Sequence, residues 1–458
     1  MRRYSRMLAM SLTVVAAAAM IWGCSGKMAA PEAQANQEGT KEGANEAAKT
    51  DEEQITLRFL SYAKSYEEIE QQIVDEYHKQ NPNVTVEIEY LTNLDSKEYL
   101  AKTDVMVMGG EKIDILMTPS PTHFTIRAES DSYLPLDSFF EAENSKPEDE
   151  FNVIYRVKDQ VYGIPAEMKY GVVMLNKDML DEAGLPVPPV NWTWDDYRDY
   201  AIKLTKGEGA NKIYGSYLHK NNEQVMYGIT SAQKGNKYFN EDGSLTFANP
   251  EFAEFLQYRY DLENTDQASV PLADVKALNL NYYEQFFNGK VAMMPMLTHV
   301  INYIGDQNYP HDFVTAVAPL PLWDKKGEHF NPVGATIYSI AKTSEHPQEA
   351  FDFLKFWCTE GVMMKGKTIA NIKGTSRLES AERMVGGFKE LIDMDSFSAY
   401  FNDEKWVDSY EDFVPPYQGE IESALLEETD KYLLNTQSLE DTVKNLMERG
   451  NAIIKENQ

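Results

Sequence analysis

The side chain best placed for covalent chemistry is Ser61, in the sequence Ser61-Tyr62-Ala63-Lys64. An S-x-x-K sequence supplies the nucleophilic serine of penicillin-binding enzymes, which also need S-D-N and K-T-G segments. Neither segment occurs downstream, and a pattern that fixes only two positions arises readily by chance. A serine acyl-enzyme, which a β-lactam probe would label at Ser61, is therefore disfavoured. We predict no catalytic residue.

Metal and nucleotide chemistry are disfavoured by spacing and by charge. The seven histidines are scattered without metal-ligand spacing, and no HExxH, GxSxG or GxGxxG sequence occurs. We therefore predict no metal site and no cofactor. The formal net charge is -30 at pH 7, which repels phosphate backbones and excludes nucleic acid as a partner. The same charge would repel an anionic membrane, so any membrane attachment needs another cause.

Side chains suited to binding a sugar follow two predicted strands. A sugar combines hydroxyls with apolar C–H faces, so its site needs carboxylates, amides, hydroxyls and flat aromatics together. In open α/β sheets, ligands lie beyond the carboxyl ends of the strands. Ser61 and Tyr62 follow the first predicted strand, and Thr118 and Ser120 follow another. We predict that these four residues contact a ligand.

A further group of candidates lies later in the chain. Glu167, Lys169 and Tyr170 bring together a carboxylate, a cation and a flat aromatic ring. We predict ligand contacts by Glu167 and Tyr170. For the remaining candidates, packing or a solvated loop is the alternative interpretation. These candidates are Tyr217, His299, Trp323, Gly334 and Arg377.

The N-terminus has the composition of an export signal. Arg2, Arg3 and Arg6 precede a mostly apolar stretch over residues 7–22, which is short for a bilayer span but typical of a signal peptide. The stretch ends in IWGC at residues 21–24, which resembles the lipobox of bacterial lipoproteins, whose cysteine carries the lipid. An ordinary cleaved signal and an uncleaved anchor are the alternatives.

The cysteine count favours the lipoprotein. The chain has two cysteines, and a lipid on Cys24 leaves Cys358 alone in an apolar helical segment, where we expect a buried thiol and no disulfide. We predict a signal peptide over residues 1–23 and lipidation at Cys24. Residues 24–54 are too polar to form a core and predict a flexible tether. The protein would then be anchored at the extracytoplasmic face of the cell membrane.

The elements that must position the binding residues alternate between strand and helix. Residues 55–60 alternate as a strand, and Ser65 with Glu68 predicts a capping box that opens a helix. Residues 84–90 and 113–116 read as further strands. Strand, helix, strand is the order typical of a parallel sheet with crossover helices.

A second alternating pattern follows, and the length of 458 residues is too great for one ordinary core. Residues 172–175 predict a strand, 176–183 a short helix closed by Gly184, and 194–204 a longer amphipathic helix. Further helices are predicted after Asn249-Pro250 and after Ser438. We expect core positions at Trp194, Trp357, Met293 and Met294.

Several segments resemble those of the bacterial extracellular solute-binding proteins of family 1. They keep order and spacing from residue 55 to the C-terminus. The segments are residues 162–165 (YGIP), 172–180 (VVMLNKDML), 183–186 (AGLP), 193–197 (TWDDY), 286–293 (FFNGKVAM) and 333–350. The chain departs from the family pattern at Leu175, where tyrosine is usual, and at residues 295–299, where Gly and Trp are frequent. The second departure leaves the type of sugar open.

The resemblance implies the two-lobed, type II periplasmic-binding-protein-like α/β fold, with a ligand cleft between hinge-connected lobes. Carried over to this chain, one lobe contains residues 55–165 and 313–362, and the other contains residues 166–312 and 363–458. The hinge strands would be residues 162–168 and 312–319.

The same resemblance implies a monomeric binding protein that captures a carbohydrate, such as an oligosaccharide, and delivers it to the permease subunits of an ABC transporter. A binding protein for a non-sugar solute stays open. So does a surface adhesin or assembly factor on the same scaffold, which would have a protein partner and no small-molecule pocket.

Overall fold

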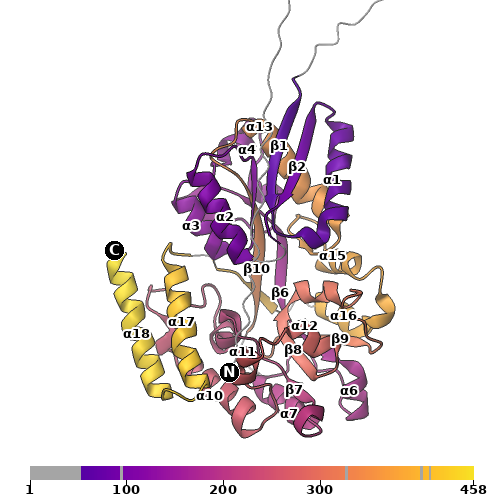
Figure 1. Cartoon of the computed structure of the whole chain (residues 1–458), viewed down its shortest axis with the longest axis vertical. Coiled ribbons are helices and arrows are strands. Elements are labelled where there is room, and N and C mark those ends of the chain that lie inside the picture. Colours follow the sequence, from indigo (N-terminus) through magenta and orange to yellow (C-terminus); the bar gives the residue numbers. More distant parts are fainter. Residues whose placement is uncertain (1–52, 93–95, 325–327, 403–405, 412–413, 458) are drawn as a thin grey trace, which may run out of the picture. The chain divides into compact units, whose positions relative to one another are not determined.

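Alternating strands and helices build the first part of the main sheet. In the computed structural model, β1 (Ile55–Ser61) pairs in parallel with β2 (Val84–Tyr90) and with β3 (Ile115–Thr118). Helix α1 (Glu67–Gln80) connects β1 to β2, and α2 (Ser96–Met108) connects β2 to β3 (Figure 1). The predicted strand–helix–strand order is confirmed.

The structure describes residues 53–92, 96–324, 328–402, 406–411 and 414–457. Residues 53–458 form one compact unit. The predicted signal peptide, Cys24 and nearly all of the predicted tether lie outside the described residues. Within the described ranges, no helix has the length and apolar character needed to cross a bilayer.

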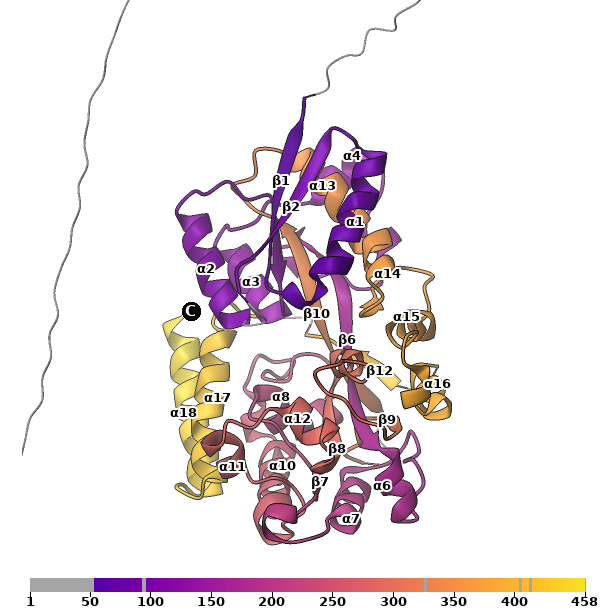
Figure 2. The same ribbon diagram turned by 45° about the vertical axis from the view of Figure 1, so that its right-hand side comes forward.

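Two long strands join the parts of the main sheet, whose order is β2-β1-β3-β10-β6-β8-β7. Strand β6 (Ile164–Asn176) pairs with β10 (His329–Ile340) along its first half. Its second half pairs with β8 (Val291–Leu297) and with β9 (Thr315–Pro319). Since β10 also pairs with β3, the strands β6 and β10 connect β1–β3 to β7–β9 (Figure 2).

The second connecting strand differs from the one expected over residues 312–319. There β9 pairs only with residues 172–176 of β6, and β10 makes the second connection instead. Every residue of β9 is buried. An apolar run bounded by proline therefore predicts a buried strand, but it does not show whether that strand connects the two parts of the sheet.

Local capping signals located most of the predicted helices. Helix α7 (Trp194–Leu204) opens with a capping box between Thr193 and Asp196, as the TWDDY segment suggests. Asn176 caps α6 (Lys177–Glu182), and Ser438 caps α18 (Leu439–Glu456). The capping box predicted at Ser65 is wrong, because a 3-10 turn over Lys64–Tyr66 precedes α1 and no side chain caps that helix.

The remaining elements are three further strands of the main sheet, a separate two-stranded sheet and the other helices. They are α3 (Pro121–Glu129), α4 (Asp137–Ala142), α5 (Pro147–Glu150), β4 (Arg156–Val157), β5 (Gln160–Val161), β7 (Tyr214–Ser216), α8 (Asn222–Val225), α9 (Tyr227–Ala232), α10 (Pro250–Tyr260), α11 (Leu272–Ala277), α12 (Tyr282–Phe287), α13 (Pro347–Phe356), α14 (Val362–Lys365), β11 (Ile369–Ala370), α15 (Arg377–Met384), α16 (Met394–Phe401), β12 (Trp406–Ser409) and α17 (Gln418–Leu433).

Aromatic residues dominate the core on the β1 side of the sheet. The rings of Phe59 and Trp357 meet edge to face at 4.9 Å, and Phe353 of α13 packs against both. Cys358 is a buried free thiol beside them, as expected. Trp194, Met293 and Met294 are also buried, which confirms their prediction as core residues.

Candidate functional site

A polar face runs along the crossing strands β6 and β10. Lys169 of β6 lies opposite Gly334 of β10, and Glu167 lies opposite Thr336. Alternate residues of a strand share a face, so these four positions lie together. Glu167 and Thr336 are buried, whereas Lys169 is partly exposed. Gly334 has no side chain and leaves the space next to Lys169 open.

Glu167 belongs to a buried ionic network. The ammonium of Lys365 on α14 lies 2.8 Å from Glu167 Oε1 and 2.9 Å from Glu70 Oε1 on α1. The hydroxyl of Tyr338 donates to Glu167 at 2.6 Å, and that of Tyr90 donates to Glu70 at 2.6 Å. Burial opposes ionisation of Glu167, but the Lys365 charge and hydrogen bond outweigh it and lower the pKa of Glu167. Glu167 and Lys365 therefore form an ionised pair at pH 7.

Tyrosines border this network. Lys365 Nζ lies 4.7 Å from the centre of the Tyr66 ring. Tyr62 is partly buried and packs on Tyr99 with ring centres 5.3 Å apart. Burial raises the pKa of Tyr62, and the nearby Glu167 charge adds to the effect. The Asn302 amide, next to Tyr303 in the chain, donates to the Tyr66 hydroxyl at 3.5 Å. Tyr62, one of the predicted ligand contacts, and Tyr66 and Tyr303, which were not predicted, thus lie near the Glu167 network.

The 3-10 helix over Thr298–Tyr303 contributes polar groups that lack partners. His299 Nδ1 and Asn302 Oδ1 are buried and accept no hydrogen bond from any described residue. The Asn302 amide donates to the Lys367 carbonyl at 2.7 Å. Burial and the charge of Lys169 lower the pKa of His299 to about 3. A neutral imidazole offers one donor and one acceptor, which suits a hydroxyl ligand.

Tyr170, the residue after Lys169 in β6, packs against the side chain of Arg377. The Arg377 guanidinium lies 4.8 Å from the centre of the Tyr170 ring, and its Nη2 lies 2.5 Å from Asp408 Oδ2. The Tyr170 amide donates to Thr298 Oγ1 at 3.1 Å, which ties this strand position to the His299 segment. Tyr170 points to the face opposite Lys169, because adjacent strand residues alternate.

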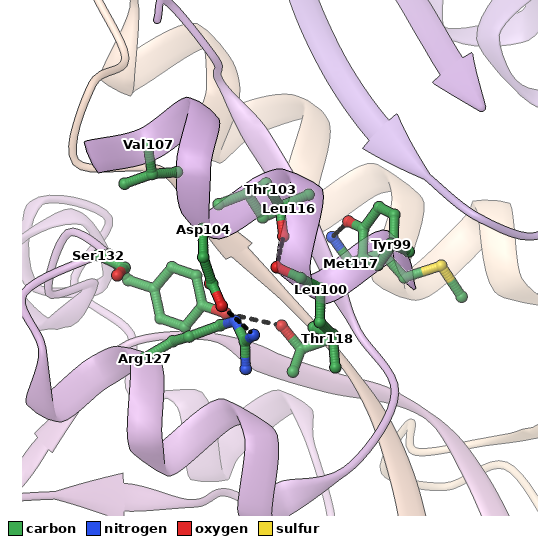
Figure 3. Close-up of a pocket in the computed structure, with 11 residues that line it drawn as sticks. Tyr99, Leu100, Thr103, Asp104, Val107, Leu116, Met117, Thr118, Arg127 and Ser132 are labelled. Carbon is green, nitrogen blue, oxygen red and sulfur yellow. Dashed lines mark hydrogen bonds and ion pairs between the residues drawn. The ribbon is translucent and has the colours of Figure 1, made fainter. Parts of the chain in front are cut away.

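Three predicted residues on the β1 side hold local structure. Ser61 is buried, accepts the Ala63 amide at 3.1 Å and donates to Met117 Sδ at 3.5 Å. Ser120 caps α3. Thr118 shares a hydrogen bond of 2.7 Å with Tyr133 and lines a small cavity with Arg127 and Asp104 (Figure 3). That cavity measures about 10 Å³, enough for one water and far too small for a sugar.

Two further candidates lie in packed regions. Tyr217 is fully buried, and its hydroxyl shares a hydrogen bond of 2.9 Å with His219 Nδ1. Trp323 packs against Phe255 in the core cluster that contains Trp194. Neither residue lies next to the Glu167 network.

The mixed sheet with two crossing strands has the two-lobed, type II α/β fold of periplasmic binding proteins. The chain belongs to the family of bacterial extracellular solute-binding proteins, whose model matches residues 63–364. Members of this family are binding proteins rather than enzymes and act outside the cytoplasmic membrane. The resemblance read from the sequence is confirmed, and so is the fold class.

Characterised relatives share this membership. The arabinooligosaccharide-binding protein of Halalkalibacterium halodurans is 28% identical over 48% of this chain and 47% of its own length, about half of that relative. The arabinooligosaccharide-binding protein of Bacillus subtilis is 22% identical over 75% of this chain and 77% of its own. A solved ABC substrate-binding protein from Listeria monocytogenes, in complex with cycloalternan, superposes with a TM-score of 0.72 at 20% identity, covering 88% of this chain and 100% of that one.

Proposed function

We propose that this protein captures an oligosaccharide and delivers it to the permease of an ABC importer. The observation that carries the proposal is the set of buried polar atoms without a partner among the described residues in the 3-10 helix over Thr298–Tyr303, beside flat tyrosine rings. Leaving a buried polar atom such as His299 Nδ1 or Asn302 Oδ1 unpaired costs about 1–3 kcal/mol, which a ligand hydroxyl would recover. The names of the arabinooligosaccharide-binding relatives support the same ligand class.

Delivery requires a movement that the ligand controls. We propose that the elements on either side of β6 and β10 are lobes that close around the sugar, and that the closed form docks on the permease. A ligand shifts such an equilibrium only through its higher affinity for the closed state. Lipidation at Cys24 would hold the protein at the outer face of the membrane.

Titration calorimetry with a panel of neutral and acidic mono- and oligosaccharides tests the binding proposal. We expect saturable binding to at least one oligosaccharide, and a smaller radius of gyration by X-ray scattering when it is bound. Tyr62→Ala should weaken that binding about tenfold, because a stacked aromatic contributes roughly 1 kcal/mol or more. Tyr200→Ala is the matched control, since Tyr200 hydrogen-bonds to the Pro186 carbonyl away from the network. No heat or scattering change with any saccharide would refute the proposal.

A further inference from the structure

Lys169 forms no ion pair with any residue that the structure describes. Its side chain is partly buried, yet within the part of the chain that the structure describes no carboxylate forms an ion pair with it and no acceptor takes a hydrogen bond from it. Burying an ammonium without a counter-ion is costly, because water solvates the charge far better than an apolar surrounding does. A group of opposite charge at this position would remove that cost.

The nearby carboxylates are already engaged. Glu167 lies on the same face of β6 as Lys169, but it binds Lys365 and accepts the Tyr338 hydroxyl. Glu70 binds the same Lys365 and accepts the Tyr90 hydroxyl. Neither carboxylate forms an ion pair with Lys169. Burial lowers the pKa of Lys169, and the nearby Glu167 charge opposes this only in part. The neighbouring His299 is neutral at pH 7 and supplies no counter-charge.

The backbone beside Lys169 carries no side chain at Gly334. Gly334 stands directly opposite Lys169 on β10, and a side chain there would begin 4.0 Å from Lys169 Cβ and 3.6 Å from Leu297. His299, with its unpartnered Nδ1, is close enough for Lys169 to influence its charge. The Lys169 ammonium, the neutral His299 imidazole and the backbone of Gly334 are thus neighbours.

We propose that the ligand carries a carboxylate at this position, as a uronic acid residue of an oligosaccharide does, and that Lys169 pairs with it. The inference rests on the proposed function and specifies its ligand class. A single negative charge fits better than a phosphate dianion, because the other cations nearby are committed: Lys365 holds two carboxylates and Arg377 holds Asp408.

The test compares acidic oligosaccharides with their own methyl esters, which keep the shape and remove the charge. Trimers of galacturonate, glucuronate and mannuronate, each as free acid and as ester, are titrated by calorimetry. For the trimer that binds, we expect the free acid to bind about ten- to a hundredfold more tightly than the ester, the range of a charge-assisted hydrogen bond. In Lys169→Met that ratio should fall to about one, and in Lys169→Arg it should largely recover.

Lys203→Met is the matched control, because it removes one exposed positive charge from α7 and should leave the ratio unchanged. Thermal unfolding of each variant verifies that it is folded. A neutral oligosaccharide that binds while no uronide does would overturn the uronate inference and leave the proposed function standing. An acid-to-ester ratio that Lys169→Met does not change would overturn the role of Lys169. If no saccharide of either kind binds, the proposed function itself is wrong.

Discussion

At the scale of single residues, the site combines groups that sequence reasoning could and could not find. Glu167, Lys169 and Tyr170 were recognisable because they are adjacent in one segment and unusually polar for a strand. Glu70 and Lys365 were not, since a charged residue on a helix is normally solvated and nothing local signals a partner in a distant helix. Their pairing exists only because α1 and α14 meet beside β6.

Lys365→Met should destabilise the fold strongly. It leaves Glu70 and Glu167 buried without their cation, and breaking a buried ion pair in this way costs about 3–5 kcal/mol. Urea unfolding at pH 7 measures the free energy of unfolding. The loss should shrink as the pH is lowered toward 5, because the stranded carboxylates then have raised pKa values and take up protons in the folded state.

Lys102→Met serves as the control for that variant. Lys102 pairs with Glu98 one helical turn away on an exposed surface, so its loss should cost no more than about 0.5 kcal/mol. If the two substitutions lower the free energy of unfolding equally, the buried network contributes no more to stability than an exposed ion pair.

At the scale of elements, the sequence predicted helix bounds correctly where a local capping motif sets them. Helix α7 was predicted with its observed bounds because Thr193 and Asp196 form a complete capping box. The Ser65 signal failed because the backbone turns first through Lys64–Tyr66, where the Tyr66 amide bonds to the Ala63 carbonyl. Which strand crosses between the two parts of the sheet is a matter of long-range pairing, and β9 and β10 could not be told apart by composition.

Gly163→Ala should disturb the start of β6. A methyl group there would lie 2.4 Å from Ser339 Oγ and 2.8 Å from the Tyr338 carbonyl of β10, so the strands must separate. Overpacking of this kind costs about 1–3 kcal/mol, measurable as a lower Tm. Gly387→Ala is the control, because nothing lies within 4 Å of its added methyl group and its stability should change by less than about 0.5 kcal/mol. If Gly163→Ala and the control have the same Tm, the backbone at Gly163 does not pack closely against β10.

The contact between α3 and α17 should depend on pH. Thr122 donates to Glu422 at 3.2 Å, and Gln418 donates to both residues. Burial and the nearby Glu411 and Glu223 charges outweigh the attraction of Lys237 and raise the pKa of Glu422 to about 7. A carboxyl group with a raised folded-state pKa binds more protons when folded, so the free energy of unfolding falls as the pH rises from about 4.5 to 7.

Glu422→Gln should remove that part of the pH dependence, up to about 3 kcal/mol between pH 5 and 8, because an amide does not titrate. Chemical unfolding across this range gives the comparison. Glu420→Gln, on the exposed side of the same helix, should keep the wild-type slope. If the free energy of unfolding varies with pH in the same way in Glu422→Gln and in the wild type, Glu422 is not the group that titrates.

At the scale of the whole molecule, the sequence identified the family and the class of fold, because family segments keep their order over most of the chain. The site could be located only roughly, since β6 and β10 lie beside groups from α1, the 3-10 helix over Thr298–Tyr303 and α14 that no short segment relates. The predicted lobe boundaries and the anchor at Cys24 stay predictions.

Lipidation at Cys24 can be tested with the two cysteines of the chain. In a bacterial host that processes lipoproteins, the full chain should partition into the detergent phase of a Triton X-114 extraction, and Cys24→Ala should move it to the aqueous phase. Cys358→Ala is the control, because that thiol is buried in the folded part and should have no influence on partitioning. Identical partitioning of both variants would exclude the lipid anchor.

The position of β10 between β3 and β6 also sets the order in which the protein can be completed. Residues 329–340 fill the gap in the sheet between strands that are made some 160 to 210 residues earlier, and Lys365 follows later still. A nascent chain that has not yet reached them holds an unclosed sheet and two carboxylates with no cation. The folded part therefore cannot be completed before residue 365 has been synthesised.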